Sequence, residues 1–319
     1  MKILIVRTSS MGDLIHTYPA LTDLARHFPD ARVSWLAEEG FARIAALHPA
    51  VETVIPIAWR RWRKSLASPA TWREIGACRR ALRDARFDLV VDMQGLIKSA
   101  IPARWAHAPL AGYDAESIRE PLASRCYDKR YPVSRALPAI ERNRQLLGRV
   151  FGYTPEGAPV FGIAAGERPA WLPAGDYAVL LHATSRASKE WPEENWVALA
   201  TRLVEEKGWT AVLPWGNDAE KARAGRLAAR IPGALAAPKL NLGEAAALLG
   251  HARAVVGVDT GLTHLANALD VPLVGIYTDT EPSLTGVVEG PRAVNLGGTG
   301  QCPTPQAVWD ALFALEGAA

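Results

Sequence analysis

The sequence predicts an α/β protein of two Rossmann-like, doubly wound domains. Short β-branched and aliphatic runs alternate with longer segments of helical periodicity along most of the 319 residues, which favours parallel sheets. The alternation stops between Tyr153 and Asp176, where eight Pro and Gly residues fall, and then restarts. The length also suits about two domains. We therefore expect domains at residues 1–160 and 161–319, facing each other across a cleft.

The first domain begins with an apolar strand and a small polar turn. We expect its strands at residues 2–6, 31–36, 51–57 and 88–93. Helices are expected at residues 14–28, 38–47 and 69–85, with another after residue 94.

The second domain repeats this alternation without repeating the sequence. Strands are expected at residues 177–181, 209–213, 254–258 and 273–277. Helices are expected at residues 192–207, 218–231, 242–250, 262–269 and 303–315. The final helix follows the last expected strand, so it could pack back on the first domain.

The composition is ordinary for a globular protein, with 49% hydrophobic and 22% charged residues. No apolar run is long enough to cross a bilayer, and the N-terminal residues fit a first strand rather than a signal peptide. The three cysteines, Cys78, Cys126 and Cys302, lack metal-ligand spacing. We expect free thiols in a reducing cytosol and no bound metal.

The net charge of +3 hides an asymmetry between the two halves. Residues 1–160 contain 24 Lys/Arg and 16 Asp/Glu, whereas residues 161–319 contain 12 and 17. A basic half attracts anionic partners such as a phosphorylated substrate, a membrane surface or nucleic acid, although a solvated basic face is the simpler explanation.

The segment from Val255 to Leu269 predicts a buried strand, a sharp turn and a helix. Free N–H groups at the helix N-terminus suit an anion, and Gly261 lets a phosphate approach the backbone. Asp259, Thr260 and His264 add polar groups at the carboxyl end of the strand, where ligands of open α/β sheets bind. The alternative is an ordinary capped loop.

Asp13 comes shortly after the first strand, at the start of the following helix. A carboxylate there is commonly an N-cap, and the alternative is a general base at the end of a strand.

Two later strand ends carry polar groups that could bind a nucleotide. Thr184, Ser185 and Lys189 could clamp a pyrophosphate, although a Ser/Thr-rich turn with a solvated lysine explains them equally. Glu220 could accept from ribose hydroxyls, or could simply favour the first turn of a helix.

Between Trp59 and Arg86 there are nine Lys/Arg and only two acids, interleaved with three tryptophans. Arg60, Arg61, Arg63 and Lys64 form the densest part. Guanidinium groups suit phosphates, Trp suits a membrane interface, and the combination also fits single-stranded nucleic acid. The acidic stretch at Asp279 and Glu281 predicts a turn and receives no role.

Neither a dinucleotide fingerprint nor a P-loop is present in the sequence. Taken together, seven segments resemble glycosyltransferase family 9, the bacterial lipopolysaccharide heptosyltransferases. They are VRTSSMGD (6–13), RRWRK (60–64), REPLAS (119–124), HAT (182–184), KEWPEE (189–194), PWG (214–216) and VDTGL (258–262). They keep their order over most of the chain. The segments at residues 60–64 and 119–124 resemble the family members that act on Kdo more than they resemble heptosyltransferase II.

The resemblance implies the glycosyltransferase B fold and inverting transfer of L-glycero-D-manno-heptose from ADP-heptose to the Kdo of Kdo-lipid A, without a cofactor or metal. It implies two catalytic residues: Asp13 as the general base and Lys189, which would hold the leaving ADP. It further implies a donor site in the second domain, formed by Thr184, Ser185, Lys189, Glu220, Leu240, Asp259, Thr260, Gly261 and His264. The acceptor would bind the first domain through Arg60, Arg61, Arg63, Lys64 and Arg119.

The resemblance also implies a cytoplasmic enzyme peripherally associated with the cytoplasmic face of the inner membrane, with no nucleic-acid partner. Two alternatives stay open. One is a second heptosyltransferase or another nucleotide-sugar transferase. The other is a nucleic-acid or membrane-surface binding protein that uses the Arg/Trp segment.

Overall fold

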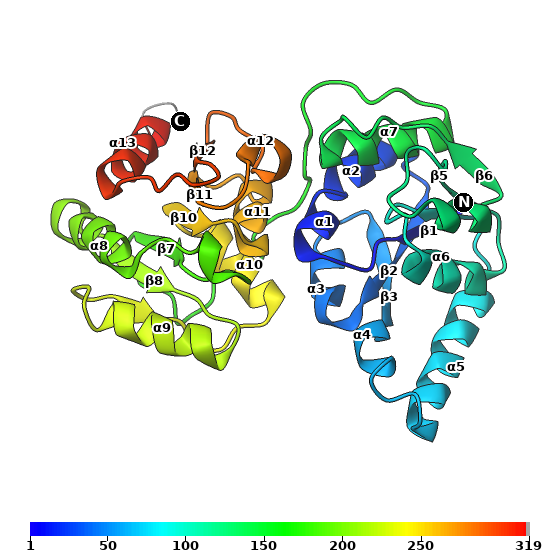
Figure 1. The fold of residues 1–319 in the computed structure, drawn as a ribbon, viewed down its shortest axis with the longest axis horizontal. Coiled ribbons are helices and arrows are strands. Elements are labelled where there is room, and N and C mark those ends of the chain that lie inside the picture. Colours follow the sequence, from blue (N-terminus) through cyan, green and yellow to red (C-terminus); the bar gives the residue numbers. More distant parts are fainter. Residues whose placement is uncertain (317–319) are drawn as a thin grey trace. The chain divides into compact units, whose positions relative to one another are not determined.

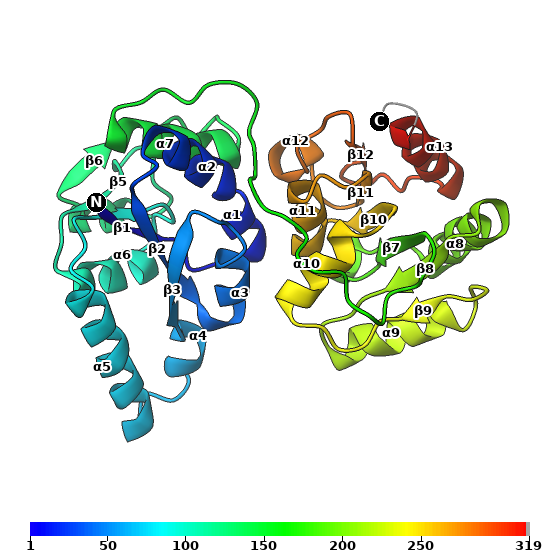
Figure 2. The same cartoon turned by 180° about the vertical axis from the view of Figure 1, so that it is seen from behind.

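The computed structural model describes residues 1–316 and divides into two compact units, Met1–Ile163 and Ala164–Ala319. Each unit contains a six-stranded sheet in which every pair of neighbouring strands is parallel. Helices cover both faces of each sheet (Figures 1 and 2). The prediction of two doubly wound α/β domains is therefore confirmed.

The first sheet has the strand order β3-β2-β1-β4-β5-β6. The chain moves outward from β1 to β3 and then returns to form β4 on the other side of β1. The strands are β1 (Lys2–Val6), β2 (Arg32–Glu38), β3 (Val51–Ile57), β4 (Leu89–Asp92), β5 (Leu110–Tyr113) and β6 (Lys129–Tyr131). The sequence predicted the first four, whereas β5 and β6 are short and were missed.

Helix α2 packs against α7, and α5 packs against the turn that follows α6, on the other face of the sheet (Figure 1). The helices are α1 (Met11–Ile15), α2 (Tyr18–His27), α3 (Ala42–Ala45), α4 (Trp59–Trp62), α5 (Pro69–Asp84), α6 (Ile97–Ala103) and α7 (Ala139–Phe151). Short 3-10 turns are η1 (Glu39–Phe41), η2 (Arg104–Ala106) and η3 (Pro121–Cys126).

The single helix expected at residues 14–28 is in fact two helices, α1 and α2. Pro19 lies in the first turn of α2 and has no N–H to donate to the carbonyl of Ile15, so the α1 ladder cannot continue. The Thr17 hydroxyl instead donates to the carbonyl of Asp13 at 2.9 Å. The break ends α1 after five residues, so Asp13 lies in a short helix that follows the carboxyl end of β1.

Helix α7 is fixed to the rest of the first unit by buried polar contacts. Arg144 Nε donates to Asp23 Oδ2 at 2.7 Å, and the two side chains are 2% and 5% exposed. Removal of one partner of such a buried pair strongly destabilises a protein, because the other charge stays buried without compensation. The pair holds α7 against α2, next to the site described below.

The second sheet has the order β12-β11-β10-β7-β8-β9. Its strands are β7 (Tyr177–Leu181), β8 (Thr210–Leu213), β9 (Leu235–Ala236), β10 (Ala254–Val258), β11 (Leu273–Tyr277) and β12 (Ala293–Gly297). All five residues of β7, and likewise of β10 and β11, are buried, which explains their continuous apolar sequences. The sequence missed β9 and β12.

Helices also cover both faces of the second sheet (Figure 2). They are α8 (Glu193–Lys207), α9 (Asp218–Ala228), α10 (Leu242–Gly250), α11 (Gly261–Ala268), α12 (Pro282–Thr285) and α13 (Pro305–Glu316), with the 3-10 turn η4 (Ala187–Lys189). The final helix packs on α8 and on its own sheet, where Val308 and Leu312 join the core. That it could also pack back on the first domain stays a prediction.

Both sheets have a switch point, where the strand order reverses between two adjacent strands. It lies between β1 and β4 in the first unit and between β7 and β10 in the second. Doubly wound proteins bind their ligands outside the carboxyl ends of these strands. Among the described helices none combines the length and apolarity needed to cross a bilayer.

Candidate active site

The switch point of the first unit opens into a cavity of about 390 Å³. Its lining comes from the loops after β1, β4 and β5 and from the start of α7. The lining residues are Arg7, Ser9, Ser10, Asp13, Met93, Gln94, Leu96, Lys98, Tyr113, Arg119, Ala139, Arg142 and Asn143. Four are cationic and one is a carboxylate, so the cavity favours an anionic ligand.

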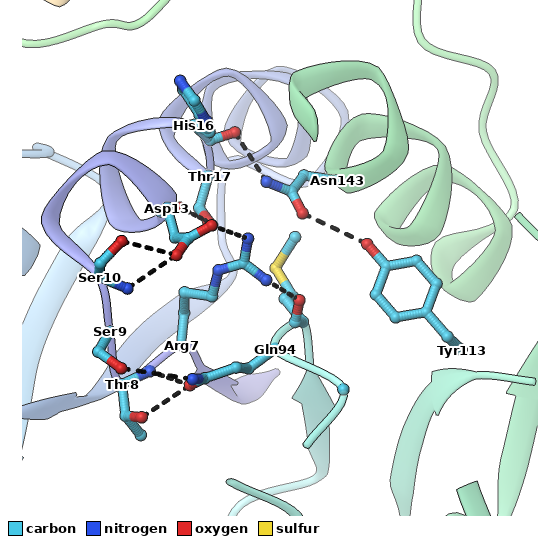
Figure 3. Close-up of polar contacts among 12 residues, drawn as sticks. Arg7, Thr8, Ser9, Ser10, Asp13, His16, Thr17, Gln94, Tyr113 and Asn143 are labelled. Carbon is cyan, nitrogen blue, oxygen red and sulfur yellow. Dashed lines mark hydrogen bonds and ion pairs between the residues drawn. The ribbon is translucent and has the colours of Figure 1, made fainter. Parts of the chain in front are cut away.

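Asp13 is not the N-cap of its helix. Ser10 occupies that position, and Asp13 is the third helical residue of a capping box. Its Oδ2 accepts hydrogen bonds from the backbone N–H and the hydroxyl of Ser10, both at 2.8 Å (Figure 3). Its Oδ1 lies 3.3 Å from Arg7 Nη2. The side chain remains 43% exposed on the cavity wall, so a ligand can reach the carboxylate.

The charge state of Asp13 is set by its neighbours. Partial burial opposes ionisation, but Arg7 and the hydrogen bonds from Ser10 outweigh it and hold the pKa of Asp13 below its usual range. The carboxylate is therefore ionised at neutral pH and keeps free lone pairs with which to accept another proton donor.

The loops that carry these residues are tied together. Gln94 Oε1 accepts hydrogen bonds from the backbone N–H and the hydroxyl of Thr8, both at 2.7 Å (Figure 3). Arg7 Nη1 donates to the carbonyl of Met93. Lys98 Nζ donates to Ser9 Oγ at 3.1 Å. The loop after β1 is thus fixed to the loop after β4 across the switch point.

A buried carboxylate, Asp92, shapes the second of these loops. It is fully buried at the end of β4 and accepts from Tyr127 Oη at 2.8 Å, Ser99 Oγ at 2.9 Å and the backbone N–H groups of Gln94 and Gly95. Burial raises the pKa of Asp92 despite these bonds. Asp92 was not among the residues predicted from the sequence, although an acid ending an apolar strand was a usable signal.

Of the cavity's cations, the sequence predicted only Arg119, which is exposed on the loop before η3. Lys98 and Arg142 were missed because α6 and α7 bring them to the switch point only in the folded unit. Arg142 stacks on Tyr113, with its guanidinium carbon 5.0 Å from the ring centroid, and donates to the carbonyl of Ser117 at 2.5 Å.

The Arg60–Lys64 segment does not line this cavity. It forms α4 and the following turn, with all four basic side chains exposed. Arg61 is held by Glu39 at 3.0 Å and by Glu74 at 2.8 Å, whereas the guanidinium of Arg60 lies over Phe41. Arg63 and Lys64 are therefore better available to an anion than Arg61.

At the switch point of the second unit, the structure brings together Thr184, Lys189 and Asp259. Lys189 Nζ lies 2.6 Å from Asp259 Oδ2, and the Thr184 hydroxyl donates to the carbonyl of Asp259 at 2.8 Å. The Thr280 hydroxyl also donates to Asp259 Oδ2 at 2.8 Å. Thr280 was missed, since the turn containing it received no role from the sequence.

Helix α11 begins directly after this cluster, with Thr260 as its N-cap and Gly261 as its first residue. Its N-terminal N–H groups therefore face the carboxyl end of β10. His264 is 8% exposed in the first turn. The hydroxyl of Thr263 donates to the backbone carbonyl of Val258 at 2.6 Å, within the same strand–helix turn.

The other predicted donor residues lie on neighbouring loops of the same unit. Glu220 is the third residue of α9, and its carboxylate accepts from the backbone N–H of Gly216 and from Asn217 Nδ2, both at 2.7 Å. Ser185 is exposed after β7, and Leu240 is half-buried before α10. Asp279 accepts from the Ser188 hydroxyl at 2.6 Å.

Within residues 1–316, no group of three or more His, Cys, Asp or Glu side chains is arranged to hold a metal ion.

Comparison with known proteins places the chain in a family. The profile of glycosyltransferase family 9 (heptosyltransferase) matches residues 75–307. Lipopolysaccharide heptosyltransferase 1 of Pseudomonas aeruginosa is 47% identical over 304 residues, covering 95% of this chain and 85% of that protein.

Two solved structures agree. Escherichia coli heptosyltransferase WaaC with ADP has 41% identity and a TM-score of 0.91, covering 100% of both chains. The same enzyme with ADP-2-deoxy-2-fluoro heptose has 42% identity and a TM-score of 0.88, covering 99% of this chain and 100% of that one. Sequence profile, relative and structures all point the same way: the chain belongs to glycosyltransferase family 9, the heptosyltransferases.

Proposed function

We propose that this protein transfers L-glycero-D-manno-heptose from ADP-heptose to the Kdo sugar of Kdo-lipid A, with inversion at the anomeric carbon. The observation that carries the proposal is an ionised, accessible carboxylate, Asp13, on the wall of a cation-rich cavity at a switch point. A relative named lipopolysaccharide heptosyltransferase 1 supports the choice of substrates, as do solved structures of a heptosyltransferase with ADP and with an ADP-heptose analogue.

The acceptor fits the first unit by charge. Kdo carries a carboxylate, and lipid A carries phosphates. Lys98, Arg119 and Arg142 on the cavity wall provide cations for the sugar acid. Arg60, Arg63 and Lys64, exposed on and after α4, would bind the lipid A phosphates, with Arg61 contributing less because it is already paired.

Asp13 acts as the general base in this proposal. The acceptor hydroxyl gives its proton to the Asp13 carboxylate while its oxygen forms a bond to the anomeric carbon. The bond from that carbon to the phosphate oxygen breaks, and its electron pair leaves with ADP. Attack from the face opposite the leaving group inverts the anomeric centre.

The second unit would bind the donor and stabilise the leaving diphosphate. Negative charge grows on the phosphate as the glycosidic bond breaks, and a positioned cation stabilises it. Lys189, the hydroxyls of Thr184 and Ser185 and the N-terminus of α11 can provide this. Glu220 would bind the ribose, Leu240 would lie beside the adenine, and Asp259, Thr260, Gly261 and His264 would complete the site. The proposal uses no metal ion or other cofactor.

The lipid acceptor also suggests where the enzyme works. We propose a cytoplasmic protein that docks peripherally on the cytoplasmic face of the inner membrane, without a nucleic-acid partner.

The decisive experiment measures ADP released from ADP-heptose with and without Kdo-lipid A. Release that depends on Kdo-lipid A, with heptose found on Kdo, is expected. Release only with an already heptosylated acceptor would indicate a second heptosyltransferase instead. Absence of transfer with every acceptor would leave binding to membranes or nucleic acid as the alternative.

A further inference from the structure

Helix α5 carries an exposed stripe that the proposed reaction does not use. Its core-facing residues are Thr71, Ile75, Cys78 and Leu82. On the other side, a groove of about 650 Å³ runs along residues spaced as one helical face, together with the preceding turn: Ala67, Pro69, Trp72, Arg73, Gly76 and Arg80.

The apolar part of this surface is unusually exposed. Trp72 is 58% exposed and Leu66 is 52% exposed, although large apolar side chains of this kind are normally buried. The two are joined, because Trp72 Nε1 donates to the carbonyl of Leu66 at 2.8 Å. The indole therefore presents its apolar ring outward while its polar N–H is already satisfied.

Among the described residues, the charges around this apolar pair that have no ionic partner are positive. Arg73 and Arg80 lie beside the groove, and Arg63 and Lys64 lie on the connection that leads to it. The two acids of the region are occupied, Glu74 by Arg61 and Trp62, and Asp84 by Arg83. Within the described part of the chain, no carboxylate is paired with Arg73 or Arg80.

We propose that the α5 patch, defined as Leu66, Trp72, Arg73 and Arg80, docks on the surface of an anionic phospholipid bilayer. Trp is favoured at the boundary between headgroups and acyl chains, and a ring whose N–H is satisfied internally can enter that boundary without leaving an unpaired donor. The two arginines would contact anionic headgroups. The connection between α4 and α5 projects from its unit, so the patch can reach a flat surface (Figures 1 and 2).

This inference rests on the proposed function, since it assigns to that lipid-directed enzyme the element by which it meets the bilayer. A docked α5 patch would bring Arg63 and Lys64 to the headgroup level. That is the level at which the phosphates of a membrane-embedded lipid A lie.

The test is flotation of the full-length protein with vesicles, in the absence of donor and acceptor. One vesicle preparation contains phosphatidylethanolamine and phosphatidylglycerol, and the other contains only phosphatidylcholine. We expect binding to the anionic vesicles alone. The double variant Leu66→Ser/Trp72→Ser should weaken binding about tenfold or more, because the apolar contact is lost. Arg73→Gln/Arg80→Gln should weaken it by a similar factor, since each basic residue near an anionic surface strengthens binding about fivefold.

Leu235→Ser is the matched control, because Leu235 is also exposed, at 42%, but lies on β9 in the second unit. It should bind vesicles like the parent. All variants should keep the parent's thermal midpoint and its transfer to a deacylated, water-soluble Kdo-lipid A. Transfer to the same acceptor embedded in anionic vesicles should fall in the two patch variants.

Equal flotation of the parent with both vesicle types would overturn the docking proposal, as would patch variants that bind like the parent. Vesicle binding that a single-stranded oligonucleotide abolishes would show a nucleic-acid surface instead. The experiment distinguishes failure of the docking proposal from failure of the proposed enzymatic function. Lost vesicle binding with intact transfer to the soluble acceptor rejects docking, and intact vesicle binding without any transfer rejects the enzymatic proposal.

Discussion

The two units share one strand order but carry different chemistry at their switch points. In the first, the loops after β1 and β4 surround a cavity with four cations and the carboxylate of Asp13. In the second, the loops after β7 and β10 hold hydroxyls and the pre-formed pair of Lys189 with Asp259. The comparison teaches that topology determines where a ligand binds, whereas the side chains on the loops determine which ligand.

The two units also differ in how their positive charges would bind an anion. The first unit has excess positive charge, so an anionic ligand adds to a surface that already attracts it. In the second, Lys189 has a carboxylate partner before any phosphate arrives. A diphosphate would have to share Lys189 with Asp259 or displace Asp259 from it. Lys189 would therefore stabilise the phosphate most strongly when the phosphate carries most negative charge.

The largest expected effect tests the carboxylate that distinguishes the first unit. Asp13→Asn should slow heptose transfer by about 10²–10⁴-fold, because the variant cannot take the hydroxyl proton. Its amide oxygen can still accept from Ser10, so the thermal midpoint should change by only a few degrees. Turnover and thermal unfolding are measured on the same preparation.

Asp128→Asn provides the control for Asp13. Asp128 is also an acid paired with an arginine in the first unit, 2.8 Å from Arg104, but it is not on the cavity wall. It should retain full turnover. If Asp13→Asn transfers heptose within a few-fold of the parent, Asp13 is only a capping residue and the base lies elsewhere.

The second prediction tests the cation of the second unit. Lys189→Ala should lower turnover about 10²–10³-fold at saturating ADP-heptose, as for loss of a group that stabilises the transition state. Lys207→Ala, an exposed lysine of α8, should have no such effect. Near-normal turnover of Lys189→Ala at saturating donor would contradict the assigned role.

The third prediction concerns a buried histidine in each unit. Burial lowers the pKa of His48 to about 4. Burial and the positive charge of Arg223 lower the pKa of His182 to about 4, with Arg226 acting in the same direction and Glu193 in the opposite one. The unfolded chain takes up these protons near pH 6.5 and the folded chain only near pH 4. Stability should therefore rise with pH between 4 and 6.5, by at most about 3 kcal/mol per histidine.

Amide hydrogen exchange can check this unit by unit. His182→Gln should flatten the pH dependence of protection in β7 and β10 across that window, and His48→Gln should do so only in β1 and β2. A parallel loss of protection on acidification in parent and variants would show that other groups control acid unfolding.

The smallest effect tests the basic segment on α4. Replacing Arg60, Arg63 and Lys64 by Gln should raise the acceptor KM about tenfold and reduce its dependence on salt, because exposed charges act through a screened field. Arg61→Gln should do much less, since Glu39 and Glu74 already hold that side chain. The donor KM should barely move. An equal rise in both KM values would indicate a structural role for the segment.

The sequence predicted those parts of the fold and site whose signal is local. Strands β7 and β10 are buried along their whole length, so continuous apolar runs identified them, and the polar turns that follow marked Thr184 and Asp259. Asp13 was singled out for a similar reason, because it lies at the start of the helix that follows β1.

Residues that reach the site only through tertiary packing were missed. Arg142 and Asn143 lie on α7, and nothing in their immediate sequence shows that this helix returns to the carboxyl end of β1. Strand β5 (LAGY) has no β-branched residue, unlike the equally short β4 (LVVD), which the sequence predicted. Strand β6 has only three residues, too few for a periodic pattern. Of the two alternatives for Asp13, the structure rules out the N-cap, because Ser10 occupies that position and Asp13 lies three residues later.

The return of α7 also determines when the first cavity can exist. The side chain of Asn143 donates to the carbonyl of His16, 127 residues earlier in the chain, at 2.9 Å. At the usual rates of synthesis, α7 emerges on the order of 10 s after α1. During that interval Asp13 and β1 have been made while one wall of the cavity has not. A ligand of this cavity can therefore bind only a nascent chain that has grown past α7, and from that moment it stabilises the first unit by mass action.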